Sequence, residues 1–243
     1  MGDYKKYIVT GGAGFIGSNL VDKLIENGHQ VLVFDDLSLG KKSNINKKAQ
    51  FHKINIESLD PTKKRINLNK IGKLFEGVDT IFHLAARTRI QPSIKEPHSF
   101  NSVNIGGTLN MLDLARIHGV RRFVFSSSSS VYGNVSEENL PTPLTAPKNP
   151  LSPYGLQKLV GEQYCKLYST IHNIDTVCLR YFSVYGERQP TKGQYAPVIG
   201  LFQRQHEEGL PMTIVGDGKQ TRDFTYVGDV VDANIKAATT ENT

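Results

Sequence analysis

The chain has 243 residues, of which 38% are hydrophobic and 21% are charged, and its formal net charge is +6. This composition is ordinary for a soluble globular protein with one large core, or with one domain and part of a second. The basic residues lack interleaved aromatics, which argues against nucleic acid as a partner. No apolar run approaches the roughly 20 residues that span a membrane. The two cysteines form no disulfide framework and have no metal-ligand spacing, which argues against a metal.

The cysteines also bear on the compartment. Cys165 and Cys178 are expected to be reduced thiols, as in a cytoplasmic protein. The first strand begins within six residues of the N-terminus, so we expect no signal peptide.

The N-terminal segment has the pattern of a strand, a glycine turn and a helix. A β-branched run at residues 7–10 leads into Gly11, Gly14 and Gly17, and apolar residues then recur with helical spacing to residue 25. Gly11 suits a tight turn, Gly14 lets the backbone approach a pyrophosphate, and Gly17 allows close helix–strand packing. With the helix N-terminus facing the phosphates, this pattern predicts a dinucleotide site.

The second predicted strand, residues 30–34, ends in two acids. Asp35 and Asp36 follow the glycine turn by about 20 residues, where an acid holds the adenosine ribose diol. A carboxylate there would repel a 2′-phosphate, so the sequence favours NAD over NADP.

Strands and helices alternate through most of the remaining chain. Further strands are predicted at 51–56, 80–86, 122–125 and 176–181, and helices at 71–75, 97–118 and 153–171, with an irregular stretch at 57–70. This order predicts an α/β fold with a doubly wound parallel sheet, the Rossmann domain of residues 1–182.

From residue 183 the pattern loosens. Helices are predicted at 197–208 and 227–240 and a short strand at 213–215. We expect residues 183–243 to form a smaller substrate-binding domain, and a truncated one, because no strand or capping element follows the last helix.

Tyr154 and Lys158 are separated by one turn of a predicted helix, downstream of the serine run 126–130 at a strand end. A nearby ammonium and a nicotinamide ring would favour the phenolate form and lower the pKa of the tyrosine. A serine hydroxyl could relay a proton between the phenolate and a substrate. His83, at the end of another strand, is interpreted as structural.

The chain resembles the extended short-chain dehydrogenase/reductase family, in particular its NAD-dependent nucleotide-sugar epimerases, such as those that act on UDP-glucose or UDP-N-acetylglucosamine. The matching motifs are Thr-Gly-Gly-Ala-Gly-Phe-Ile-Gly at 10–17, His-Leu-Ala-Ala at 83–86, the serine run with Val-Tyr-Gly at 126–133, Ser-Pro-Tyr-Gly-Leu-Gln-Lys at 152–158, Arg-Tyr-Phe-Ser-Val-Tyr-Gly at 180–186 and Gly-Asp-Gly-Lys-Gln-Thr-Arg-Asp-Phe at 216–224. The resemblance implies 4-epimerisation of a UDP-sugar through a transient 4-keto intermediate.

The resemblance also implies residue roles: Ser128 as proton relay, Tyr154 as base and Lys158 as its partner. The positions that match the family's NAD contacts are Gly11, Gly14, Phe15, Ile16, Gly17, Asp35, Asp36, Ser38, Gly40, Asn55, Ile56, Leu84, Ala85, Ala86, Asn104, Tyr154, Lys158 and Phe182. The positions that match its substrate contacts are Ser128, Ser183, Val198 and Arg222.

Two departures from the family pattern bear on the reaction. Ser183 stands where the family usually has a substrate-contacting asparagine, which puts that contact in doubt. Ser129 and Ser130 stand where family dehydratases have Asp-Glu and decarboxylases Glu, so the sequence favours epimerisation over elimination. The alternatives are a sugar-nucleotide 4-reductase or dehydrogenase, and a non-catalytic NAD-binding protein.

The resemblance further implies a homodimer built from the helices predicted at 97–118 and 153–171. The apolar candidates for that interface, some of which must face the sheet, are Met111, Leu112, Leu156, Leu159, Tyr164 and Leu167.

Overall fold

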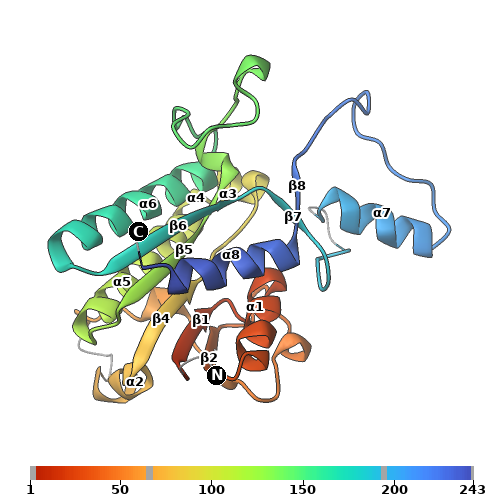
Figure 1. Cartoon of the computed structure of the whole chain (residues 1–243). Coiled ribbons are helices and arrows are strands. Elements are labelled where there is room, and N and C mark those ends of the chain that lie inside the picture. The colour runs from red at the N-terminus through yellow and green to blue at the C-terminus, as the bar shows by residue number, and fades with distance from the viewer. Residues whose placement is uncertain (1–3, 64–67, 193–195, 242–243) are drawn as a thin grey trace.

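A six-stranded parallel sheet runs through the centre of the molecule in the order β3-β2-β1-β4-β5-β6 (Figure 1). The computed structural model describes residues 4–63, 68–192 and 196–241. The strands of this sheet are β1 (Lys6–Thr10), β2 (Gln30–Asp35), β3 (Gln50–Lys53), β4 (Val78–His83), β5 (Arg122–Ser128) and β6 (Asp175–Tyr181). The predicted doubly wound α/β fold is confirmed, and the strand order reverses between β1 and β4, where such sheets bind ligands.

Helices cover both faces of the sheet (Figure 1). They are α1 (Phe15–Glu26), α2 (Leu68–Phe75), α3 (Ile90–Lys95), α4 (Pro97–Asn101), α5 (Thr108–Ile117), α6 (Pro153–His172), α7 (Val198–Glu207) and α8 (Val227–Thr239). Among the residues described, none of these helices is both long and apolar enough to cross a membrane.

The buried side chains form one core on each face of the sheet. Along β1, Tyr7 and Val9 point into the core under α1 and α8, whereas Ile8 points into the core under α5 and α6. All three side chains are at most 2% exposed. Continuous apolar strands of this kind are expected where a parallel sheet is covered on both sides.

The helix predicted at 97–118 is interrupted. It consists of α4, a π-helical segment (Ser102–Gly107) and α5. The structure also contains α3, which the sequence did not predict, because six residues are too few for a helical period to be recognised. Part of the irregular stretch predicted at 57–70, residues 64–67, lies outside the described residues.

The strand predicted at 213–215 was wrong. Ile214 and Val215 are 68% and 74% exposed in a segment without regular structure, and no strand of the described residues pairs with them. Instead β7 (Ser183–Tyr185) and β8 (Phe224–Tyr226) form a two-stranded parallel sheet, from which α7 and its long connection extend away from the main body (Figure 1).

The last helix, α8, packs on the main sheet. Its Val231, Ala237 and Ala238 are buried in the same core as α1, and the Ala237 carbonyl accepts from Arg122 Nη1 at 2.7 Å. The domain boundary expected at residue 183 stays a prediction, although α8 lies beyond it in sequence and against the Rossmann sheet in space.

Candidate active site

The glycine turn between β1 and α1 leaves space and hydrogen-bond donors for a pyrophosphate. Gly11 has φ +71°, and a Cβ there would lie 2.8 Å from the backbone nitrogen of Ala85, so only glycine fits. At Gly14 the nearest atom to an added Cβ is the Gly11 carbonyl oxygen at 3.1 Å. The first turn of α1 has neither a side-chain cap nor an acid, so its N–H groups, which include those of Phe15 and Ile16, suit an anion.

Asp35, at the end of β2, holds this turn in place. Its Oδ2 accepts from Ala13 N at 3.0 Å and its Oδ1 from Leu37 N at 2.8 Å. Burial raises the pKa of Asp35, and these two backbone hydrogen bonds act in the opposite direction. A carboxylate has further lone pairs, so the arrangement is compatible with the predicted ribose contact.

The neighbouring positions predicted for adenosine ribose lie in the same loop. Asp36 Oδ1 accepts from Ser38 N at 2.8 Å, which fixes the turn after β2. Gly40 lies against Asp35, since a Cβ on Gly40 would be 2.8 Å from Asp35 Oδ1. The loop therefore returns to the glycine turn.

The adenine-side pair lies after β3. Asn55 is exposed, and its Oδ1 already accepts from Glu57 N at 2.9 Å, which leaves one lone pair for the predicted adenine contact. Ile56 is 3% exposed and packs so closely on the π-helical segment that a Cβ on Gly107 would lie 2.7 Å from it.

Three of the residues predicted to contact NAD directly follow β4. Leu84, Ala85 and Ala86 are partly buried, and Ala85 N donates to Thr10 Oγ1 at 3.1 Å. Asn104, 3% exposed in the π-helical segment, uses its side chain to hold the backbone of Arg87 and the side chain of Gln157 rather than pointing into open space.

His83 has the structural character that its position suggested. It is 1% exposed, and its two ring nitrogens lie 3.0 Å from the hydroxyls of Thr10 and Thr108. Burial, and secondarily the charge of Lys158, lowers the pKa of His83 to about 3, so the ring is neutral.

The structure brings Ser128, Tyr154 and Lys158 together at the C-terminal end of β5. Ser152 caps α6 through a 3.1 Å hydrogen bond from Gly155 N, and this cap sets the first turn that carries Tyr154. Burial raises the pKa of the Tyr154 phenol, whereas a hydrogen bond with Ser128 and the charge of Arg89 lower it.

Lys158 is almost fully buried beside this phenol. Its Nζ lies 5.9 Å from the centre of the Tyr154 ring and donates to the Ser126 carbonyl at 2.6 Å. Burial lowers the pKa of Lys158 to about 8, so the ammonium gives up its proton far more readily than a surface lysine.

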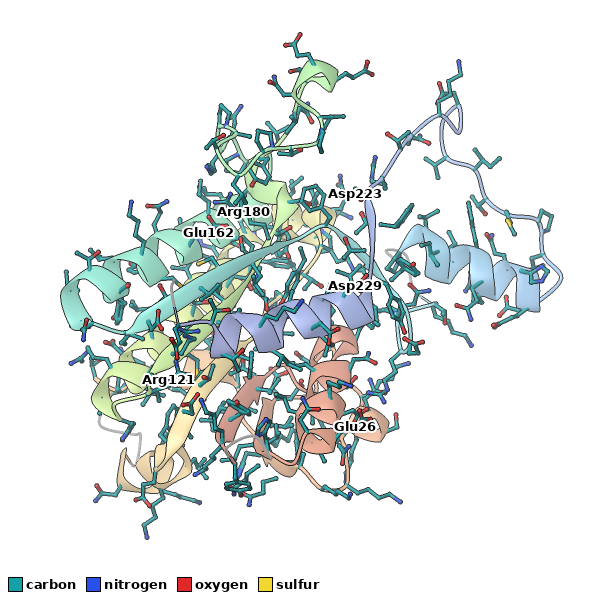
Figure 2. The ribbon with its side chains drawn as sticks, viewed as in Figure 1. Glu26, Arg121, Glu162, Arg180, Asp223 and Asp229 are labelled. Atoms are coloured by element: carbon teal, nitrogen blue, oxygen red, sulfur yellow. The ribbon has the colours of Figure 1, made fainter. Side chains whose placement is uncertain are left out.

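An ion-pair network behind these residues was not predicted. The Arg180 guanidinium on β6 bonds both carboxylate oxygens of Glu162, one helical turn after Lys158, and donates to the Tyr132 hydroxyl at 2.7 Å (Figure 2). Ser127, next to Ser128, donates to the same carboxylate at 2.6 Å. Glu162 lies at i+4 from Lys158 on the same helix face, and this spacing is the sequence feature that could have indicated the network.

The predicted substrate contacts are more dispersed. Ser183 N donates to the Asp223 carbonyl at 3.0 Å and so joins the 216–224 motif to β7. Arg222 is exposed and, among the described residues, bonds only the Thr221 carbonyl, while Val198 at the start of α7 is 40% exposed. The structure does not bring either side chain to the Tyr154 cluster.

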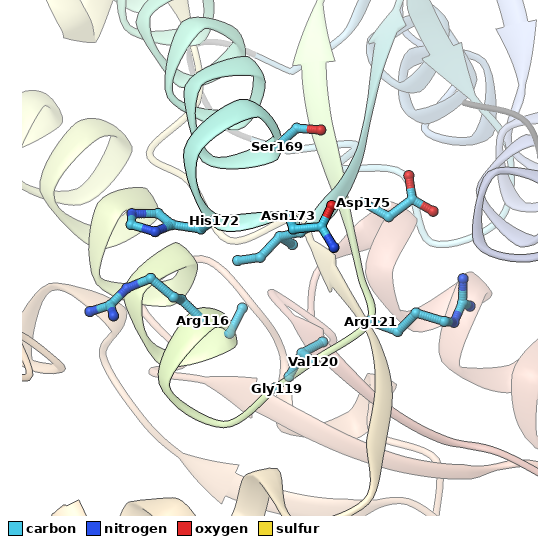
Figure 3. Close-up of a pocket in the computed structure, with 10 residues that line it drawn as sticks. Arg116, Gly119, Val120, Arg121, Ser169, His172, Asn173 and Asp175 are labelled. Atoms are coloured by element: carbon cyan, nitrogen blue, oxygen red, sulfur yellow. The ribbon is translucent and has the colours of Figure 1, made fainter.

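Two hollows lie at opposite ends of the strands. One of about 320 Å³ is lined by Phe182, Ser129 and Tyr132, on the side of the predicted catalytic residues. A larger one of about 410 Å³ is lined by Arg116, Arg121, His172 and Asp175 among others, where β5 and β6 begin (Figure 3). The larger hollow therefore lies at the N-terminal ends of the strands, opposite to the end that carries the predicted catalytic residues.

Comparison with known proteins agrees with this geometry. The model of the NAD dependent epimerase/dehydratase family matches residues 7–243. A relative from Methanocaldococcus jannaschii is 45% identical over 236 residues, which are 97% of this chain and 74% of that protein.

Two solved structures have the same fold. The UDP-glucose 4-epimerase of Thermotoga maritima, solved with UDP-glucose, is 40% identical with a TM-score of 0.88 and is matched over 96% of this chain and 72% of its own. The UDP-N-acetylglucosamine 4-epimerase of Methanobrevibacter ruminantium, in complex with UDP-N-acetylmuramic acid, is 36% identical with a TM-score of 0.90 over 99% of this chain and 75% of its own. The chain thus belongs to the NAD dependent epimerase/dehydratase family.

Proposed function

We propose that this chain is an NAD-dependent UDP-sugar 4-epimerase. The observation that carries the proposal is the convergence of Ser128, Tyr154 and buried Lys158 at the end of β5. They lie at the C-terminal ends of the strands, where parallel α/β folds bind ligands, and the glycine turn lies at the same end of the sheet. The family and its solved UDP-sugar 4-epimerases support the same reaction.

In this proposal Tyr154 accepts the proton of the sugar 4-hydroxyl and later returns it. Ser128, which lowers the pKa of the phenol, assists the transfer, and Lys158 stabilises the phenolate and binds the nicotinamide ribose. NAD, when bound, would supply the acceptor for the hydride of sugar C4 and the donor that returns it to the opposite face. The residues of the glycine turn and Asp35 orient it, and the 4-keto sugar must turn over between the two transfers.

The substrate class can be tested by product analysis. The protein is incubated with UDP-glucose, UDP-N-acetylglucosamine and UDP-glucuronate, and the products are followed by NMR. We expect the 4-epimer of at least one substrate, with glucose- or N-acetylglucosamine-type sugars favoured. Accumulation of a 4-keto-6-deoxy sugar or of a pentose would overturn the proposal, because Ser129 and Ser130 offer no acid for elimination.

The alternatives differ in their cofactor cycle. A 4-reductase or dehydrogenase would consume one equivalent of cofactor for each product, whereas an epimerase recycles it. A non-catalytic NAD-binding protein would bind NAD without reducing it. An assay that follows NADH through one turnover distinguishes them, because an epimerase regains NAD, a dehydrogenase accumulates NADH, a reductase oxidises added NADH, and a non-catalytic protein does none of these.

We also propose that the chain forms a homodimer through α6 and its neighbour α5. Leu156, Leu167 and Ile171 on α6 are 51%, 48% and 57% exposed, and their spacing places them on one helix face. Met111 and Leu112, two of the expected interface residues, are fully buried in the core and face inward instead. Light scattering should give a dimer that Leu167→Asp converts to a monomer, and a monomeric wild type would refute this assembly.

A cytoplasmic location is part of the proposal. Cys165 and Cys178 are both free thiols, and Cys178 raises the pKa of Cys165, so the two side chains are neighbours. Neighbouring thiols that stay reduced suit a reducing compartment. A thiol titration of protein purified without reductant should find both groups free, and a disulfide would count against this location.

A further inference from the structure

The short helix α3 is attached directly to the backbone of Tyr154. Ser93, fully buried on α3, accepts the Tyr154 N–H at 3.2 Å and donates its own hydroxyl proton to the Ile90 carbonyl at 2.6 Å. The start of α3 is therefore held at a fixed place relative to the first turn of α6.

The loop before α3 is clamped as well. Asn104 accepts from Arg87 N at 2.8 Å and donates to the Arg87 carbonyl at 2.9 Å. Two residues later Arg89 has φ +93° and ψ +133° at the N-cap of α3, a conformation that side-chain-bearing residues rarely adopt. Strained backbone that the surrounding structure holds in place is typical of functional sites.

The two arginines of this loop differ in environment. Arg87 is exposed and forms a salt bridge in which its Nη1 lies 3.9 Å from Glu96 Oε2. Arg89 is half-buried, and no carboxylate pairs with it among the residues the structure describes. A partly buried cation without a counter-ion is costly unless an anion forms beside it. Arg89 and the phenol of Tyr154 act on each other electrostatically: the charge of Arg89 lowers the pKa of Tyr154, and Tyr154 raises the pKa of Arg89.

We propose that Arg89 is a positioning residue that stabilises the phenolate form of Tyr154 through its fixed positive charge. This inference rests on the proposed role of Tyr154 as the base. Among the described residues, Arg89 from the loop before α3 and Ser128 from β5 lower the pKa of the phenol, and Lys158 Nζ, from α6 itself, lies 5.9 Å from the centre of its ring.

Lys158 and Arg89 differ in the pH range over which their side chains stay positively charged. Lys158, with a pKa of about 8, loses its proton in mildly alkaline solution and then offers the phenol no positive charge. Burial also lowers the pKa of Arg89, but a guanidinium stays protonated throughout the working range of a protein. Arg89 thus keeps the phenolate stabilised at pH values where Lys158 becomes neutral.

The test measures the ionisation of Tyr154 without requiring turnover. Tyrosinate absorbance is titrated with pH for the wild type and for Tyr154→Phe, and the difference isolates this one phenol. In the Arg89→Met background we expect the pKa of Tyr154 to rise by about one pH unit, as removal of a nearby opposite charge predicts. Arg89→Lys should restore most of the shift, and Arg87→Met is the matched control that removes a charge from the same loop.

Thermal melting and NAD binding report whether each variant is folded. Arg89→Gly is a second charge-free variant, and glycine suits the positive φ, so it should show the same shift as Arg89→Met. An unchanged Tyr154 titration in folded Arg89→Met and Arg89→Gly would overturn the proposal. If the Arg89 variants show the shift but the wild type epimerises no UDP-sugar, the proposed function fails and the effect of Arg89 on the phenol stands.

Discussion

The carbonyl oxygen of Gly11 lies directly over the first turn of α1, so that a Cβ on Gly17 would be only 2.2 Å from it. Glycine is required here by packing, since the φ of Gly17 is ordinary. The same contact brings the N-terminus of α1 against the end of β1, where the pyrophosphate is expected.

Gly17→Ala should therefore force the helix and strand apart. Overpacking of this kind costs about 3 kcal/mol of unfolding free energy, and NAD affinity should fall because the N–H groups of α1 move. Denaturant unfolding and calorimetric NAD binding measure the two effects. Gly106→Ala is the control, because an added Cβ there meets no atom within 4 Å, and it should behave like the wild type.

A second prediction concerns acid stability. The pKa of His83 is about 3 in the folded protein against an ordinary value of 6.5, so the unfolded chain binds the extra proton first as pH falls. The contribution of neutral His83 is complete above pH 6.5 and is lost between that value and about 3. Its loss approaches about 1.4 kcal/mol per pH unit within that window.

His83→Gln isolates this effect, because glutamine can still hydrogen-bond the hydroxyls of Thr10 and Thr108 but does not titrate. Unfolding free energies are compared for the two proteins at several pH values. The advantage of the wild type should shrink as pH falls below 6.5, since all other groups titrate in both proteins. A difference that stays constant from pH 7 to pH 4 would contradict the assigned pKa shift.

The third prediction concerns the network behind the site. Glu162 is 7% exposed and is bonded by Arg180 at 2.8 and 2.6 Å, so Glu162→Gln leaves a mostly buried guanidinium without its counter-ion. Removal of one partner of such a pair costs about 3 kcal/mol. Chemical denaturation should show this loss, and the double variant Glu162→Met/Arg180→Met should lose less than Glu162→Gln alone.

The matched control is Lys23→Gln. Lys23 and Glu26 form an exposed pair at 3.8 Å, with side chains 47% and 68% exposed. Exposed pairs of this kind contribute less than about 1 kcal/mol. Equal losses in Glu162→Gln and Lys23→Gln would show that burial does not set the strength of the Arg180 pair.

Local patterns predicted the parts of the fold that they determine. The glycine turn, the six strands of the main sheet and the i,i+4 pair of Tyr154 and Lys158 depend on contacts within a few residues or on apolar runs, and the structure has them at or near the predicted places. The serine run was placed at a strand end, and Ser128 is indeed the last residue of β5.

What escaped prediction depends on distant contacts. The π-helical turn is associated with the bond that Asn104 makes across to Gln157, which is 53 residues away in the sequence. The position of α3 depends on Ser93 meeting Tyr154 across 61 residues, and Val215 is not in a strand because no strand in the described part of the chain pairs with it. The side of the sheet that α8 covers is likewise set by tertiary contacts such as Arg122 with Ala237.

The last prediction separates catalysis from binding at Tyr154. Tyr154→Phe removes one oxygen, keeps the ring, and leaves the glycine turn and Asp35 untouched, so NAD binding should survive. Turnover of a UDP-sugar should fall roughly 10²–10⁴-fold, the usual contribution of a positioned general base. Lys158→Met should lower turnover and NAD affinity together, because Lys158 is proposed both to stabilise the phenolate and to hold the nicotinamide ribose. Calorimetry and a single-turnover assay of NAD reduction distinguish the two patterns. If Tyr154→Phe epimerises as fast as the wild type, Tyr154 is not the base, and Ser128 would then have to take the proton unaided.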